Sequence, residues 1–128
     1  MIAGMCPVRD PESYLFCTLP PETLSAAVIA QACALFREDE GVSLIVACAA
    51  ARAMGVPDTP PYFARITLMV HSALEGVGLS AAVAGALAEA DIPCNMVAAF
   101  HHDHLFVPID QAENAMQVLE ALQRAHQD

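Results

Sequence analysis

The sequence has few basic residues and no long apolar stretch. The first feature argues against nucleic-acid and membrane-surface partners, and the second argues against a membrane-spanning helix. Five Lys+Arg residues stand against fifteen Asp+Glu, for a formal net charge of -10. Such a charge repels phosphate backbones and anionic membrane surfaces, so we expect no nucleic-acid partner and no membrane partner. The longest apolar run, residues 24–35, is broken by Ser25 and Gln31 and is shorter than the roughly 20 residues that span a bilayer. No positively charged start followed by an apolar segment precedes it, so we expect no signal peptide and a cytoplasmic protein.

The chain also lacks the short motifs of common catalytic, redox and phosphate sites. Its five cysteines are odd in number and form no C-x-x-C pair, so we expect reduced and mostly buried thiols. His71 and Ser72 are neighbours in a predicted strand and point to opposite faces, and no G-x-S-x-G elbow is present, which argues against nucleophilic catalysis. Gly76 and Gly78 lack the lysine of a Walker motif and the full G-x-G-x-x-G pattern. We therefore predict no enzyme activity and no cofactor.

What the chain does contain is a large apolar fraction. Hydrophobic residues make up 56% of the sequence and charged residues 16%, which is typical of folded chains. A chain of 128 residues forms one domain or two small units. The segment GVPDTPPYF, residues 55–63, carries a glycine and three prolines that continue neither a helix nor a central strand. We therefore predict two units, residues 1–60 and 61–128.

The second half has the patterns of three strands and two helices. Alternating apolar residues predict the strands, and apolar residues at helical spacing predict the helices. The expected elements are a strand at 64–72, a helix at 79–91, strands at 94–101 and 104–109, and a helix at 111–125. A turn centred on His102 and Asp103 would join the last two strands, and Asp110 is the expected N-cap of the last helix. This order lacks one strand of a βαββαβ unit, which a neighbouring unit could supply.

The first half repeats this order in a weaker form. A strand is expected at 13–19, two strands at 32–38 and 42–47, and a short helix at 48–54. The acidic turn between the paired strands contains Gly41, for which we expect a positive φ. Residues 20–31 have helical composition but begin with two prolines, so the first helix is expected to be eroded. We predict an α+β protein of two βαββαβ units, the first degenerate, with an antiparallel sheet and helices on one face.

Four segments carry a resemblance to a known family. They are LEGVGLSAAVAGALAEADIPCN (74–95), FREDEGVSLIV (36–46), ITLMVHSALEGVGLSAAV (66–83) and NMVAAFHHDHLFVPID (95–110). The first resembles the loop, helix and second-strand entry of ACT domains, the ferredoxin-like βαββαβ modules found in aspartokinase regulatory regions. Together the four are similar to small stand-alone bacterial proteins with two ACT-like units. The resemblance implies the tandem fold and a small-molecule ligand, whereas fold likeness alone does not establish function.

The resemblance also implies a ligand site between ACT units. Typical ACT modules bind a free amino acid with the loop after the first strand and the start of the second strand, where a helix N-terminus can hold the α-carboxylate. Here the loop has Val77-Gly78 where many modules have Pro-Gly. Carried onto this chain, the implied ligand residues are His71, Ser72, Leu74, Glu75, Val77, Gly78, Leu79 and Asn95.

The cluster HHDH, residues 101–104, has three competing interpretations. It can be a polar turn in which Asp103 accepts backbone hydrogen bonds, or a pocket lip in which Asp103 binds a cationic ligand group beside His101. It can also be a metal site, because imidazoles and a carboxylate suit zinc, iron or nickel. Adjacent strand residues point to opposite faces, however, so His101 and His102 do not readily share one ion.

Three functional hypotheses follow. The leading one is a non-catalytic regulatory sensor that binds a small molecule between ACT-like units, and the resemblance implies that this molecule is an amino acid. The second is a metal-binding protein or small metal-dependent enzyme built on His101, His102, Asp103 and His104. The third is a structural dimerisation module without a ligand. The unpaired sheet edges of such units favour a homodimer in each case.

Overall fold

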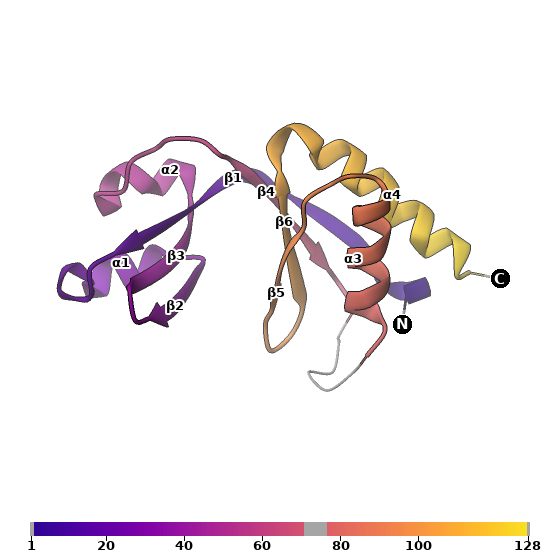
Figure 1. Cartoon of the computed structure of the whole chain (residues 1–128), viewed down its shortest axis with the longest axis horizontal. Coiled ribbons are helices and arrows are strands. Elements are labelled where there is room, and N and C mark those ends of the chain that lie inside the picture. Colours follow the sequence, from indigo (N-terminus) through magenta and orange to yellow (C-terminus); the bar gives the residue numbers. More distant parts are fainter. Residues whose placement is uncertain (1, 71–76, 128) are drawn as a thin grey trace. The chain divides into compact units, whose positions relative to one another are not determined.

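The computed structural model describes residues 2–70 and 77–127, and the chain divides into two compact units (Figure 1). The large unit consists of Met1–Pro11 and Phe63–Asp128, and the small unit of Glu12–Tyr62. The N-terminal residues therefore group with the second half of the chain. No helix within the described residues has the length and apolarity needed to cross a membrane.

The large unit contains the predicted order of elements and a further strand from the start of the chain. Its elements are a short 3₁₀ helix, η1 (Ile2–Gly4), the first part of β1 (Pro7–Leu19), β4 (Phe63–Leu68), α3 (Leu79–Glu89), β5 (Asn95–Ala98), β6 (Asp103–Pro108), η4 (Ile109–Gln111) and α4 (Ala112–Ala125). The strand order is β1-β4-β6-β5, and β6 pairs antiparallel with both β4 and β5. The first residues of β1 thus supply the strand that the second half lacks.

The core of the large unit lies between its sheet and its two helices (Figure 1). Ile66 and Leu68 of β4 are fully buried and alternate with half-buried Arg65 and Thr67, as the period-two pattern predicted. Val83, Leu87, Ala115 and Leu119 come from one face of each helix and have no exposed surface. Each fully buried valine or leucine side chain contributes about 1.5–3 kcal/mol through its transfer from water, and the alanine methyl contributes less. The predicted apolar stripes are confirmed.

Two local predictions in this unit are wrong. The hairpin turn lies two residues earlier than expected: Ala99 N donates to His102 O at 3.0 Å, and Asp103 is already the first residue of β6, opposite Ala98. Asp110 is not an N-cap, because a 3₁₀ turn precedes α4 and Ala112 N donates to Ile109 O. The residue at the N-cap of α4 is Gln111, which makes no side-chain cap bond.

The small unit is built on the second part of β1. Its other elements are η2 (Pro21–Thr23), α1 (Ala26–Gln31), β2 (Ala34–Glu38), β3 (Gly41–Ala47), α2 (Cys48–Ala51) and η3 (Arg52–Met54). β3 lies between β1 and β2 and pairs antiparallel with both. The first helix is eroded to six residues, as predicted. Gly41 has φ 153°, and a Cβ there would lie 2.9 Å from Thr18 Oγ1 and 3.2 Å from Leu19 O, so this turn requires glycine.

The prediction that most cysteines are buried is wrong. Cys6 and Cys33 are exposed, and Cys17, Cys48 and Cys94 are half-buried. Burial raises the pKa of Cys17 and Cys94, and burial followed by the charge of Asp58 raises that of Cys48. A raised pKa lowers the thiolate fraction at neutral pH, so these three thiols are poor nucleophiles.

Candidate functional site

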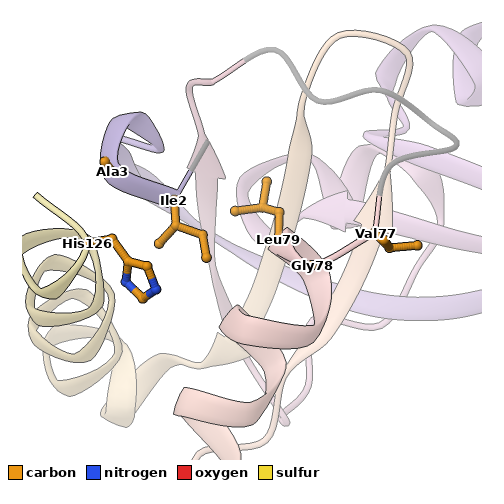
Figure 2. Close-up of a pocket in the computed structure, with 6 residues that line it drawn as sticks. All are labelled: Ile2, Ala3, Val77, Gly78, Leu79 and His126. Atoms are coloured by element: carbon orange, nitrogen blue, oxygen red, sulfur yellow. The ribbon is translucent and has the colours of Figure 1, made fainter.

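A cavity of about 280 Å³ opens in the large unit beside the first turn of α3 (Figure 2). Three separate parts of the chain form its wall: η1, the start of α3 and the residue that follows α4. The lining residues are Ile2, Ala3, Val77, Gly78, Leu79 and His126. Figure 2 shows the imidazole of His126 and the side chains of Ile2 and Leu79 facing the same space, whereas Val77 points away from it.

The start of α3 presents backbone donors without a side-chain acceptor. Its N-cap is Gly78, which has no side-chain cap bond, and its first turn contains no acidic residue. Gly78 has φ 107° and ψ -46°, a conformation that residues with a Cβ rarely adopt. A Cβ at this position would meet nothing within 4 Å, so the backbone conformation rather than space requires glycine. Because the first N–H groups of a helix have no intrahelical partner, they can donate to an anion in the cavity.

Among the lining residues that the structure describes, the only ionisable side chain is the imidazole of His126. It follows α4 directly, and its Nδ1 lies 3.0 Å from Leu122 O. A carbonyl oxygen only accepts, so Nδ1 carries the proton of this hydrogen bond. Figure 2 shows one ring nitrogen of His126 on the side of α4 and the other on the side of Ile2 and Leu79.

Two glutamines near the end of α4 hold the N-terminal wall of the cavity. Gln123 Nε2 donates to Ala3 O at 2.9 Å, and Gln127 Nε2 donates to the same oxygen at 3.1 Å. Gln123 Oε1 in turn accepts from Cys6 N at 3.2 Å. Ile2 packs against the core of the large unit. The wall is therefore anchored by three hydrogen bonds and one apolar contact.

The implied ligand residues fall into three groups. His71, Ser72, Leu74 and Glu75 lie outside the described residues. Val77, Gly78 and Leu79 line the cavity, and of these Val77 is 95% exposed whereas Leu79 is 5% exposed. Asn95 begins β5, is exposed, and uses its Nδ2 to donate to Phe106 O at 3.3 Å. It is not among the lining residues.

The HHDH side chains point in different directions. His101 is exposed and packs edge-on against Phe100, with ring centroids 5.1 Å apart. His102 Nδ1 lies 3.5 Å from Val70 O. Asp103 and His104 are consecutive residues of β6 and occupy opposite faces of the sheet. Within the part of the chain that the structure describes, no three His, Cys, Asp or Glu side chains are placed to hold a metal ion.

Asp103 is buried rather than in a polar turn. It is 6% exposed and shares a strand face with Leu105, whose side chain is fully buried in the core. Its register partners are Leu68 and Ala98. Neither Asp103 nor His101 is a lining residue of the cavity, so the polar-turn interpretation of Asp103 is wrong and the pocket-lip interpretation has no support at this cavity.

His104 forms a polar contact on the opposite face of β6. Its Nδ1 lies 2.8 Å from Thr67 Oγ1, its register partner on β4. Burial, followed by the charges of Arg65 and His102, lowers the pKa of His104, and Asp103 opposes this shift. Arg65 itself forms an ion pair with Asp10 of β1. This cluster supports the sheet and does not reach the cavity lining.

Comparisons with known proteins agree with the fold. Models of the ACT domain match residues 1–62 and 65–121. A Vibrio cholerae protein of unknown function, described as a possible transport protein, is 37% identical over 92% of this chain and 90% of its own, with a TM-score of 0.81. The regulatory subunit of aspartate kinase from Thermus flavus has a TM-score of 0.59 at 14% identity, covering 91% of this chain and 95% of its own. No curated protein sequence matches the chain.

The two family matches and the Vibrio relative define the class. The chain belongs to the ACT domain family and carries two ACT domains in tandem. The likeness to the aspartate kinase subunit, at its low identity, concerns the fold alone. The resemblance predicted from the sequence is thereby confirmed. ACT domains are typically regulatory modules that bind small ligands such as amino acids.

Proposed function

We propose that this protein is a non-catalytic regulatory sensor that binds a free amino acid in the cavity beside α3. The observation that carries the proposal is the coincidence of that cavity with the uncapped start of an eleven-residue helix. The backbone N–H groups of the first turn would hold the α-carboxylate, which the helix dipole also favours. The remaining wall is mostly apolar and suits the rest of a small ligand.

The size and chemistry of the cavity support a small metabolite and no reaction. A volume of about 280 Å³ lies just below the range typical of drug-sized ligands. Within the described part of the lining, His126 is the one side chain that could act as a base, and the other five residues provide no nucleophile. Binding, rather than bond making or breaking, is therefore the activity that we assign to this site.

Regulation by such a site requires two states with different affinity for the ligand. A bound amino acid shifts the equilibrium only by the difference between those affinities. We propose that the protein acts in the cytoplasm and passes the signal to a separate protein. We also propose a homodimer, because β5 lies at an edge of the large unit's sheet and β2 at an edge of the small unit's, and unpaired edges favour association.

The proposal is tested by a thermal-shift screen of the full chain against the twenty amino acids. A ligand at 100 times its dissociation constant adds about 2.7 kcal/mol to the free energy of unfolding, which raises the midpoint by several degrees. Val77 provides a matched pair of variants, because it is 95% exposed and changes there leave the core intact. We expect Val77→Glu to weaken binding of the amino acid about two- to fivefold and Val77→Lys to strengthen it by a similar factor, through their charges near the carboxylate.

Val77→Gln serves as the uncharged control and should bind like the wild-type protein. A stabilising amino acid whose affinity is the same in Val77→Glu and Val77→Lys would place the ligand elsewhere. Stabilisation by a divalent metal alone would favour the metal-site hypothesis at HHDH. The absence of any shift across amino acids and metals would favour the structural dimerisation module.

A further inference from the structure

The imidazole of His126 is the polar side chain at the end of the cavity that lies beside α4. A hydrogen bond to the backbone fixes the orientation of its ring. His126 Nδ1 is committed to Leu122 O at 3.0 Å. In the neutral imidazole the other nitrogen, Nε2, then carries a lone pair and acts as a hydrogen-bond acceptor. Figure 2 places the ring nitrogen that is remote from α4 on the side of Ile2 and Leu79, which both line the cavity.

The surroundings of His126 limit what else it can do. Ile2 and Leu79 are apolar, and Leu79 is 5% exposed. Ala3 contributes to the lining, but its carbonyl oxygen already accepts hydrogen bonds from Gln123 and Gln127. This oxygen therefore gains little from a further donor on a ligand. Among the lining side chains of residues 2–70 and 77–127, His126 Nε2 is therefore the acceptor that is offered to a ligand.

We infer that His126 makes the cavity selective for amino acids whose side chain carries a hydrogen-bond donor, a hydroxyl or an ammonium group. The inference rests on the proposed function, because it concerns the side-chain end of the same ligand. His126 is exposed in the absence of a ligand, and an apolar side chain of equal size that covers Nε2 would remove its contact with water without giving it a partner, which costs binding free energy. A donor group on the ligand side chain forms a hydrogen bond to Nε2 and avoids this cost.

The wall that faces His126 is fixed, so the selectivity has a geometric basis. Gln123 and Gln127 each donate to Ala3 O, and Cys6 N donates to Gln123 Oε1, so that Ala3 and Cys6 are held against the end of α4. His126 directly follows α4 and lies between Gln123 and Gln127 in the chain, so the imidazole and the N-terminal wall belong to one hydrogen-bonded assembly. A pre-organised wall reduces the entropy lost on binding. It also cannot adjust to a ligand whose donor is misplaced, so such a ligand binds less tightly.

The test uses two pairs of amino acids that differ only in the donor group. L-threonine and L-valine differ by a hydroxyl against a methyl, and L-lysine and L-norleucine differ by an ammonium against a hydrogen. We expect the full chain to bind the donor member of at least one pair about three- to tenfold more tightly, as measured by isothermal titration calorimetry. The pair that discriminates identifies the hydroxyl or the ammonium as the recognised group.

Variants at His126 then show whether the preference comes from the imidazole. His126→Phe keeps a ring and removes the acceptor, and we expect it to bind both members of the discriminating pair equally. His126→Gln restores an acceptor and should recover part of the preference. Gln117→Ala, at an exposed position of the same helix, is the matched control and should bind like the wild-type protein.

The outcomes separate this inference from the proposed function. Amino-acid binding without preference in both pairs, or an unchanged preference in His126→Phe, overturns the inference and leaves the sensor function standing. The absence of binding by any of the twenty amino acids overturns the sensor function, and the inference with it.

Discussion

The first helices of the two units, α3 and α1, begin in opposite ways. α3 starts after Gly78, which has no side chain and a positive φ, and its first turn borders a cavity. α1 starts after Ser25, whose Oγ accepts from Val28 N at 3.2 Å. In the small unit the hydroxyl of Ser25 thus accepts the hydrogen bond that a carboxylate could otherwise accept. The comparison teaches that one unit leaves the first donors of its helix without a side-chain cap, whereas the other uses one of them for its own stability.

The same contrast holds for the helices as a whole. α3 and α4 have eleven and fourteen residues, whereas α1 and α2 have six and four. The buried cluster of the large unit is correspondingly more extensive than that of the small unit. Helices as short as α1 and α2 gain little from their own hydrogen bonds and depend on packing against the sheet for their stability.

The largest effect that we predict compares one buried leucine from each core. Leu119 of α4 is 0% exposed and Leu44 of β3 is 1% exposed. Leu→Ala substitutions at buried sites cost about 2–5 kcal/mol, and the cost falls where the surroundings can collapse into the space. We expect Leu119→Ala near the upper end and Leu44→Ala near the lower end, measured by urea unfolding with circular dichroism. A larger loss for Leu44→Ala would show that the small unit is the more rigid of the two.

A smaller effect tests the contrast between the helix starts. Ser25→Ala removes the cap of α1 and should cost about 1 kcal/mol in the free energy of unfolding. Ser80→Ala is the matched control, since Ser80 is an exposed residue in the first turn of α3 and not its N-cap. It should change the free energy by less than about 0.5 kcal/mol. Equal losses for the two variants would contradict the assigned role of Ser25.

The smallest effect concerns pH and the large unit's sheet. Burial and the charges of Arg65 and His102 lower the pKa of His104 from its ordinary 6.5. The unfolded chain therefore binds more protons than the folded chain just below that value, so stability falls as pH drops through this window. We expect His104→Gln to reduce the loss of unfolding free energy between pH 7.5 and 5.5. His101→Gln, in the exposed turn, should leave that loss unchanged; an equal effect of both variants would contradict the prediction.

Most of the fold followed from local patterns. The alternation of Ile66 and Leu68 and the helical spacing of Val83 and Leu87 report burial directly, because period two and period 3.6 each bring one set of side chains to one face. The eroded α1 was predictable because two prolines precede it. The exposure of Cys6 and Cys33 was not predictable, because both lie outside the strands and helices. In such segments no periodic pattern distinguishes buried from exposed residues.

The site was predictable in part. Val77, Gly78 and Leu79 came from the resemblance and line the cavity, whereas Ile2, Ala3 and His126 were not anticipated. Ala3 and His126 come from opposite ends of the chain, and no local pattern reports such a contact. The shift of the turn near Asp103 had another cause. β6 pairs with two strands, and these pairings extend it to a polar residue that turn propensity alone assigns to the loop.

The shared strand β1 has a consequence for the order in which the protein is made. Its residues 7–11 belong to the large unit and its later residues to the small unit. At about 5–20 residues per second, the ribosome needs roughly 3–11 s after Pro11 to complete β4, the large-unit neighbour of β1. All strands of the small unit have been synthesised by then. Among the strands of the large unit, β1 therefore waits longest for its partner, and residues 2–3 and 126 must meet before the wall of the cavity exists.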